Sequence, residues 1–418
     1  MRLGAFILLL AGCPVGALAV EPISLEQAIQ EAIANNMELV AERFSLSVSE
    51  ARQITAALRP NPILTVQAQS LELLGTRFIP ASPAGPNQFN VHTDYVMERG
   101  HKRQQRIAFA AEDRRLVDLQ IRELTRRLIL DLQAGFVDVQ QARLAGLLAG
   151  QNLKSLQGIV TVNENRVRTG DLAEVELDRS RVAVLQYETA VAQSRLALEQ
   201  ARTRLQRLMG RRTTSADFDV SGDLRRETKK ETAEAIVLRA LERRPDLAAL
   251  KQAEIRSRAD LKLQLANGRV DYLLGAEYTY QRAFGFGGPS LGFSFSAPLP
   301  VFNKNQGEIA RAQREGRQWE SRGSALETGI RSEVELAYRQ YETTGGLLKN
   351  IEMNLLTRAQ KVRDVTEYSY RRGEATLIEF LDAQRAFNDA VQSHNEARAS
   401  HARSLYLLDA VAADTIEK

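Results

Sequence analysis

The sequence is poor in the residues that build thick globular cores or reactive sites. Of its 418 residues, one is cysteine, one is tryptophan and four are histidine, and aromatic residues make up 6%. A single cysteine excludes a disulfide framework. So small an aromatic content beside 26% charged residues favours long helices that pack through small side chains over a thick core.

An excess of one charge is also missing. The chain has 56 Lys and Arg against 52 Asp and Glu, a formal net charge of +4. The basic residues alternate with acidic ones along the expected helices, a pattern typical of solvated helix faces. Nucleic-acid binding needs a concentrated basic surface, so we predict no nucleic-acid partner.

No arrangement of residues typical of a catalytic site is present. The glycines at 285–288 lie in an expected hairpin with no helix behind them, so they form no phosphate-binding loop. His394 and His401 are seven residues apart, too far for one helix to chelate a metal with both, and they share an apolar seam with Phe387. We therefore predict packing histidines, no metal site, no cofactor and no enzymatic activity.

Long apolar runs are absent except at the N-terminus. Arg2, the apolar stretch Leu3–Ala11 and the small-residue site Ala17-Leu18-Ala19 predict a signal peptide cleaved after Ala19. A competing interpretation treats Leu10–Cys13 as a lipobox, with Cys13 as an acylated N-terminus. No later stretch is apolar enough for a transmembrane helix, so any membrane-spanning part is expected to be a β-barrel.

Two stretches of the chain resemble each other. Tyr368–Arg385 reads YSYRRGEATLIEFLDAQR, and Arg166–Val182 reads RVRTGDLAEVELDRSRV. Each places a glycine between two helix-forming runs, Gly170 and Gly373, at an offset of 203 residues (373 − 170). Because glycine accepts the positive φ that closes a helix, each stretch is predicted to be the tip of a helical hairpin.

A second pair of matching segments extends this similarity. Ser24–Leu39 aligns with Thr232–Leu247 at an offset of 208 residues (232 − 24). Matched segments at nearly one offset predict a duplicated unit. We expect a signal peptide at 1–19, a first structural repeat at 20–230 and a second at 231–418.

The first repeat is expected to open with one long helix. Ser24 and Gln27 have the spacing of a capping box. The apolar face that follows predicts a helix to about Leu58, where Arg59-Pro60 ends it.

Period-two alternation predicts four strands, at about 63–70, 88–97, 271–280 and 290–298, with a turn at Gly285–Pro289 in the second repeat. The apolar face of the second pair is expected to hold Tyr272, Tyr278, Tyr280, Phe293 and Phe295, and the polar face Asp271, Glu277 and Ser294. Such strands are typical of a transmembrane barrel, although a soluble sheet buried on one face alternates in the same way. Four strands are too few to close a barrel, so oligomerisation is expected.

The strand pairs are each followed by a long helix-forming segment, Gly100–Gly170 and Asn303–Gly373. About 65 residues of helix at 1.5 Å per residue reach roughly 100 Å. The returning segment after Gly170 repeats apolar residues at steps of three and four, which indicates coiled-coil-like packing. This length suits a tube that crosses a compartment.

Taken together, these features resemble the TolC family of outer-membrane efflux factors over essentially the whole mature chain. The resemblance is carried by the duplicated N-terminal helix, the strand pairs, the glycine-centred tips and the strand-to-helix exits. The exits read ERGHKRQQRIAFA (Glu98–Ala110) and SAPLPVFNKNQGEIARA (Ser296–Ala312). They are most similar to the heavy-metal branch, the partners of Czc- and Cus-type pumps, although His101 stands where that branch has a second glycine.

The resemblance implies a mainly α protein with a small β part, a TolC-like trimeric α/β-barrel. Four membrane strands per chain would give twelve in the homotrimer, embedded in outer-membrane lipid of a Gram-negative bacterium and continuous with a periplasmic helical barrel. It implies an exit duct of a tripartite proton-driven system, conducting divalent heavy-metal cations. The implied partners are a periplasmic membrane-fusion adaptor and an inner-membrane RND-type transporter.

The resemblance also implies roles for residues near the tips. Glu379 and Asp382 match the family's acidic constriction, with Glu176 at the corresponding place of the first repeat. Tyr370 matches a residue that holds the tip closed. Ala375 replaces the arginine of that latch, so Arg371, Arg372 or Arg179 is expected to substitute. The tips expected to contact the adaptor comprise Gly170, Gly373, Arg166, Asp171 and Glu374.

Two alternatives stay open at this point. A TolC-like duct for drugs or for type I protein secretion would share every feature above, because substrate choice is expected to lie in the pump. A secreted coiled-coil scaffold would explain the long helices and the signal peptide, but not the duplicated strands.

Overall fold

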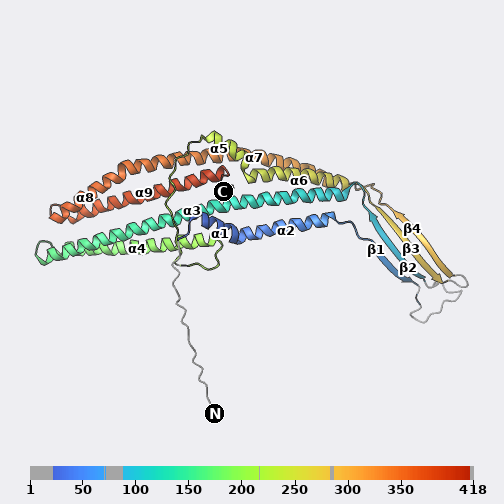
Figure 1. The fold of residues 1–418 in the computed structure, drawn as a ribbon, viewed down its shortest axis with the longest axis horizontal. Coiled ribbons are helices and arrows are strands. Elements are labelled where there is room, and N and C mark those ends of the chain that lie inside the picture. The colour runs from blue at the N-terminus through green and yellow to red at the C-terminus, as the bar shows by residue number, and fades with distance from the viewer. Residues whose placement is uncertain (1–21, 70, 72–87, 216, 283–286, 415–418) are drawn as a thin grey trace, which may run out of the picture. The chain divides into compact units, whose positions relative to one another are not determined.

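The structure is a computed structural model that describes residues 22–69, 71, 88–215, 217–282 and 287–414 (Figure 1). The predicted signal peptide, with Cys13, lies outside these residues, as does most of the loop that follows the first strand. Among the described helices, none is both long and apolar enough to cross a membrane.

The N-terminal segment folds as two helices, α1 (Leu25–Asn35) and α2 (Met37–Ala57). The predicted capping box is present, since Ser24 N donates to Gln27 Oε1 at 2.9 Å and Gln27 N donates to Ser24 Oγ at 3.2 Å. The prediction of one continuous helix to Leu58 is wrong. Asn36 interrupts it with an extended backbone (φ −60°, ψ 120°), and its side-chain amide donates to Leu208 O at 2.9 Å.

The same break recurs at the start of the second half. Helices α5 (Ala233–Arg243) and α6 (Pro245–Asn267) are separated by Arg244, whose backbone is also extended (φ −65°, ψ 123°). Pro245 occupies the first position of α6, where its missing N–H costs nothing and its ring prevents helix continuity from α5.

Both segments that follow a strand pair are helical over almost their whole length, as predicted. The first hairpin consists of α3 (Lys102–Arg168) and α4 (Glu174–Leu208). The second consists of α7 (Gln306–Asn350), a π-helical turn η1 (Ile351–Leu356), α8 (Thr357–Arg372) and α9 (Leu377–Val411). The π-helical turn was not predicted, because nothing in its local sequence interrupts the helical pattern.

Four antiparallel strands form one sheet in the order β1-β2-β3-β4 (Figure 1). Their bounds are Ile63–Gln69 (β1), Gln88–Met97 (β2), Tyr272–Arg282 (β3) and Gly287–Ser296 (β4). The predicted turn through Pro289 is wrong, since Gly288 pairs with Gln281 and Pro289 with Tyr280. An edge strand such as β4 tolerates proline because it needs no ladder hydrogen bond on its outer side.

The alternation of residues along the strands separates an apolar face from a polar one. The pairs Ala276–Phe293 and Tyr278–Leu291 bring apolar side chains together across β3 and β4. Phe293 is 87% exposed and Leu291 76%, so this face is uncovered in the single chain. The other face carries polar side chains, including His92 and Glu277, which are paired across β2 and β3.

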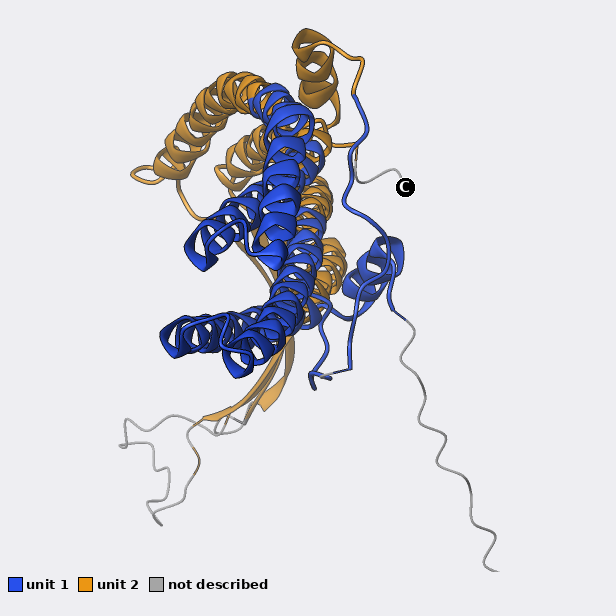
Figure 2. Ribbon diagram, turned by 90° about the vertical axis from the view of Figure 1, so that its left-hand side faces the viewer, with its two compact units in different colours: residues 1–36, 128–228, 340–406 blue, residues 37–127, 229–339, 407–418 orange. Residues whose placement is uncertain are grey.

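The chain separates into two compact units, coloured in Figure 2. Unit 1 comprises 1–36, 128–228 and 340–406, and unit 2 comprises 37–127, 229–339 and 407–418. Unit 1 contains both hairpin tips and a small apolar core in which Val137, Leu224 and Ala402 are buried together. Unit 2 contains the sheet.

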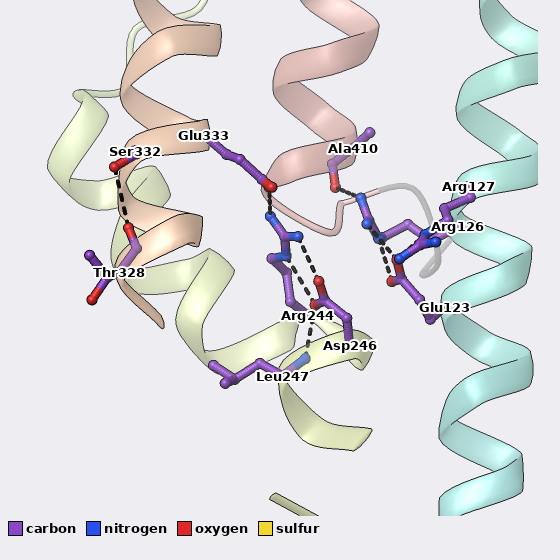
Figure 3. A network of polar contacts seen from close by, with 10 residues as sticks. All are labelled: Glu123, Arg126, Arg127, Arg244, Asp246, Leu247, Thr328, Ser332, Glu333 and Ala410. Atoms are coloured by element: carbon purple, nitrogen blue, oxygen red, sulfur yellow. Dashed lines mark hydrogen bonds and ion pairs between the residues drawn. The ribbon is translucent and has the colours of Figure 1, made fainter. Parts of the chain in front are cut away.

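Buried charge, rather than apolar packing alone, organises part of unit 2 (Figure 3). Arg244 is 3% exposed. It donates to both carboxylate oxygens of Asp246 at 3.1 and 2.6 Å, and to Glu333 at 2.5 Å. Nearby, Arg126 donates to Glu123 and to Ala410 O at 3.0 Å. Burial raises the pKa of Asp246, but the hydrogen bonds and charge of Arg244 outweigh it and hold that pKa below its usual range.

Candidate functional site at the hairpin tips

The two hairpin tips use one backbone motif. Gly170 and Gly373 both have positive φ, +83° and +80°. At the first tip Gly170 N donates to Val167 O and Asp171 N to Arg166 O. At the second, Gly373 N donates to Tyr370 O and Glu374 N to Ser369 O. This is the Schellman motif, which satisfies the last carbonyls of a helix and requires a left-handed residue at the glycine position.

Tyr370 joins the two hairpins just behind their tips. Its ring is 2% exposed and stacks on Phe380 at a centroid distance of 5.6 Å. Its hydroxyl donates to Asn163 Oδ1 on α3 at 2.6 Å. Burial raises the pKa of Tyr370 although the Asn163 bond opposes that shift, so the phenol stays a hydrogen-bond donor. Leu156, Ile159, Ala183 and Leu377 complete the surrounding apolar cluster.

Arg166 reinforces this junction and is not simply a surface residue of its tip. Its guanidinium carbon lies 5.8 Å from the Tyr370 ring centroid, and Nη1 donates to Tyr370 O at 3.4 Å. A Cβ at Gly373 would lie 2.8 Å from Arg166 Nη2. Gly373 is therefore required for its positive φ, and a side chain there would also displace the end of the Arg166 side chain.

The predicted constriction carboxylates lie at the start of the outgoing helices. Glu379 is exposed and caps α9, since Thr376 N donates to it at 2.7 Å and Thr376 Oγ1 at 2.9 Å. The hydrogen bond from the Thr376 backbone lowers the pKa of Glu379, and the bond from its hydroxyl adds to that effect. Asp382 lies 3.5 Å from Arg385. Glu176, at the start of α4, accepts from Arg179 at 2.6 Å.

The remaining predicted tip residues pair locally. Arg371 donates to Glu367 at 2.8 Å, so both it and Arg179 bind carboxylates of their own helices. Arg372 lies 4.0 Å from Glu374, and Asp171 accepts from Thr169 at 2.7 Å. The arginine that contacts Tyr370 is Arg166.

A ladder of amide side chains behind the tips was missed by the sequence analysis. Gln384 donates to Asn152 at 3.2 Å and to Asn388 at 3.0 Å, and Asn388 donates to the Tyr187 hydroxyl at 2.8 Å. Asn152, Tyr187 and Asn388 also line a cavity of about 430 Å³ in unit 1. The available signal was the spacing of Asn152 and Asn163, eleven residues apart, which puts both amides on one face of α3.

The two histidines of α9 differ in their surroundings. His401 is 6% exposed, stacks on Tyr341 at 5.5 Å between ring centroids and lies 3.4 Å from Thr344 Oγ1. His394 instead places Nε2 3.2 Å from Glu352 Oε1, in the π-helical turn. His401 is therefore a buried packing residue, whereas His394 forms a polar pair with Glu352.

Comparisons with known proteins find similarity to outer-membrane efflux proteins. Residues 236–413 match the family model described as outer membrane efflux protein. The chain is 24% identical over 390 residues to the cobalt-zinc-cadmium resistance protein CzcC of Cupriavidus metallidurans, covering 89% of this chain and 85% of that protein.

Solved structures show the same fold. A CusC structure matches with a TM-score of 0.74 at 15% identity, covering 93% of this chain and 91% of that one. The open-state MtrE outer membrane channel of Neisseria gonorrhoeae matches with a TM-score of 0.74 at 16% identity, covering 93% and 88%. The predicted fold class is confirmed. Residues 236–413, in the second half of the chain, match the outer membrane efflux protein family, and 93% of the chain has the fold of the CusC and MtrE structures.

Proposed function

We propose that the protein is the outer-membrane exit duct of a tripartite, proton-driven efflux system and that it passively conducts divalent heavy-metal cations. The observation that carries the proposal is the similarity to a cobalt-zinc-cadmium resistance protein, which extends over 89% of the chain and so is not confined to one motif. Members of this family are channels and not enzymes, and we infer that this chain likewise performs no chemistry on its cargo.

The exposed face and edges of the sheet support assembly with further copies of the chain. The strands β1 and β4 are edges, and an uncovered edge beside an exposed apolar face is a site for pairing or aggregation. A homotrimer that joins β4 of one chain to β1 of the next would satisfy both edges and turn the apolar face to outer-membrane lipid. We further propose that the tips around Gly170 and Gly373 meet a periplasmic membrane-fusion adaptor, which links the duct to an inner-membrane RND-type transporter.

The contacts at the tips support a division of labour between closure and selectivity. Tyr370 is buried and its bond to Asn163 ties the two hairpins of one chain together, so it acts on closure. Glu379 and Asp382 are exposed on α9, so in a trimer three copies of each could face a common axis. A ring of carboxylates attracts cations and impedes anions.

The substrate is tested by deleting the gene in its host. We expect sensitivity to cobalt, zinc and cadmium salts to rise while sensitivity to organic drugs stays unchanged, with complementation by the intact gene as the control. The reverse pattern, sensitivity to drugs alone, would show that the duct serves another substrate class.

The tip assignments are tested by planar-bilayer recording of the purified protein. Glu379→Ala with Asp382→Ala should reduce cation selectivity and block by multivalent cations. Tyr370→Phe should raise the open probability and leave selectivity nearly intact, because it removes a hydroxyl contact and no charge. Tyr187→Phe is the matched control, since it removes a phenol hydroxyl beside the same apolar cluster but loses a bond from Asn388 and leaves the Tyr370–Asn163 bond in place. Wild-type selectivity in the double variant would exclude these carboxylates from the constriction.

A further inference from the structure

A histidine and a carboxylate form a close pair on the polar face of the sheet. His92 and Asp94 lie two residues apart on β2, so their side chains project from the same face. His92 Nε2 lies 2.8 Å from Asp94 Oδ1. The two side chains are 26% and 22% exposed, so both are shielded by their neighbours and yet reachable from solvent.

The residues directly opposite this pair on β1 and β3 carry no positive charge. His92 is flanked by Thr65 on β1 and Glu277 on β3, and Asp94 by Ile63 and Gly275. These four neighbours include no basic side chain and one further carboxylate, Glu277. Directly opposed residues have Cβ atoms about 4.5–5.5 Å apart, so Glu277 adds a second negative charge beside the pair.

Gly275 provides the space in which the two side chains meet. A Cβ at this position would lie 2.8 Å from His92 Cε1, 3.0 Å from Asp94 Oδ1 and 2.2 Å from Ser294 Oγ. Contacts this short would force the pair apart. The absence of a side chain on β3 therefore allows the imidazole and the carboxylate to approach each other.

A second pair of the same type lies in unit 1 and differs in one respect. His394 Nε2 is 3.2 Å from Glu352 Oε1. The guanidinium of Arg226 lies 3.6 Å from the same oxygen. A cation bound there would meet a fixed positive charge, whereas no such charge flanks the pair on β2.

We propose that His92 and Asp94 form a weak binding station for divalent transition-metal cations on the polar face of the sheet. The imidazole nitrogen and the carboxylate oxygen would supply two ligands, water the remainder, and Glu277 the nearest additional carboxylate. Zinc binds nitrogen at about 2.0–2.1 Å and carboxylate oxygen at about 2.0–2.2 Å, which at angles of 90–109° separates the two atoms by roughly 3.0–3.4 Å. The pair needs to open only slightly to accept an ion.

The weakness of the station fits the proposed function, on which its role in passage rests. Among the described residues, no group of three or more His, Cys, Asp and Glu side chains is arranged to hold a metal. A two-ligand station releases its ion readily, and conduction requires binding that is favourable enough to enter but weak enough to leave. In a duct, it would raise the local concentration of metal cations over that of monovalent ions.

Equilibrium dialysis of the purified full-length protein against zinc chloride and cobalt chloride tests the proposal. His92→Gln and Asp94→Asn remove a ligand and keep a polar side chain of similar size, and His394→Gln is the matched control. The expected result is one zinc ion per chain fewer for His92→Gln and Asp94→Asn at saturation than for wild type. His394→Gln should bind as wild type does.

A site-specific readout accompanies the dialysis. Copper and ascorbate oxidise histidines that hold the copper ion, and peptide mass spectrometry then locates the oxidation among the four histidines. Oxidation concentrated at His92, and reduced at least several-fold by Asp94→Asn, supports the station. Equal zinc binding by wild type and His92→Gln, or oxidation at His394 instead, would overturn it. Because binding is measured on purified protein, a drug-sensitive, metal-insensitive deletion strain would reject the proposed cargo without rejecting the station.

Discussion

The two hairpin tips have nearly the same backbone and are held by different side chains. Helices α4 and α9 each contain 35 residues, and both follow a Schellman tip at a glycine with positive φ. Yet α9 starts with a side-chain cap from Thr376, whereas at α4 the corresponding Ala173 makes no side-chain cap. The comparison therefore distinguishes the glycine that both tips need for their backbone from the side-chain cap that stabilises only α9.

The same contrast is found at the helix breaks near the start of each predicted repeat. Asn36 and Arg244 have almost identical backbone angles. The Asn36 side chain donates a neutral hydrogen bond to a carbonyl, whereas Arg244 is buried in an ionic network with Asp246 and Glu333. One geometry can therefore be stabilised by interactions of very different strength, and paired substitutions measure the difference.

The largest expected effect is at the breaks. Arg244→Ala removes both of the hydrogen bonds that Arg244 gives to Asp246 and leaves that carboxylate only the charge of Arg126 nearby. Loss of one partner of a buried ion pair typically costs about 3–5 kcal/mol. Asn36→Ala removes a neutral bond and should cost about 1 kcal/mol. Urea unfolding of the detergent-solubilised variants, followed by far-UV circular dichroism, measures both. Removing both charges with Arg244→Met and Asp246→Leu should restore part of the loss. Equal destabilisation by the two single variants would contradict the contrast.

The next effect concerns the tips. Gly170→Ala and Gly373→Ala both force a side chain into positive φ, at a cost of roughly 1–2 kcal/mol each. Only at Gly373 would the new Cβ also meet Arg166, whereas at Gly170 nothing lies within 4 Å. Gly373→Ala should therefore disturb the Arg166–Tyr370 contact and raise the open probability in bilayer recordings more than Gly170→Ala does. The opposite order would show that Arg166 yields without disturbing Tyr370.

Local signals predicted the backbone of these elements well. The glycines at the tips and the alternation of the strands each constrain φ or ψ directly, so a single sequence reveals them. The break at Asn36 was missed because asparagine carries no such constraint, although alignment with Arg244-Pro245 would have located it. His101 shows the reverse: its φ of +58° matches the +63° of Asn305, and each lies directly before a long helix, so the backbone takes a left-handed residue here although the residue is not glycine.

Partners across the fold could not be predicted in the same way. The family resemblance predicts a closing role for Tyr370, but its acceptor Asn163 lies 207 residues away in sequence, and no local pattern connects them. Arg166, which contacts Tyr370, is similarly distant from it in sequence, at 204 residues. Such pairs follow from how the hairpins pack, which depends on many weak apolar contacts at once.

A smaller effect is expected from the helix cap that only one hairpin possesses. Thr376→Ala removes the hydroxyl that accepts from Glu379 N and donates to Glu379 Oε2, and loss of such a cap typically costs about 1 kcal/mol. Ala173→Thr should stabilise the start of α4 by a similar or smaller amount, because it gives that helix the cap it lacks. Hydrogen exchange of the first-turn amides measures both. Unchanged protection in Thr376→Ala would show that the cap contributes little.

The smallest effect is a pH dependence confined to one hairpin. His401 of α9 corresponds to Leu198 of α4, at the offset of 203 that relates the tips (401 − 198). Burial lowers the pKa of His401, with Arg226 acting in the same direction and Glu227 opposing. Because the folded protein disfavours the imidazolium, neutral His401 contributes stability that is fully present above its unfolded pKa of about 6.5. This contribution is lost as the pH falls through the pKa of His401 in the folded protein. Below pH 6.5, the unfolding free energy of wild type should therefore fall faster than that of His401→Leu, by at most about 1.4 kcal/mol per pH unit.

Urea unfolding between pH 5 and 8 measures the slopes, which should be parallel above pH 7 where His401 is neutral in both states. Parallel slopes below pH 6.5 as well would mean that His401 binds its proton in the folded protein as readily as in the unfolded chain, and that the two hairpins do not differ in their response to acid.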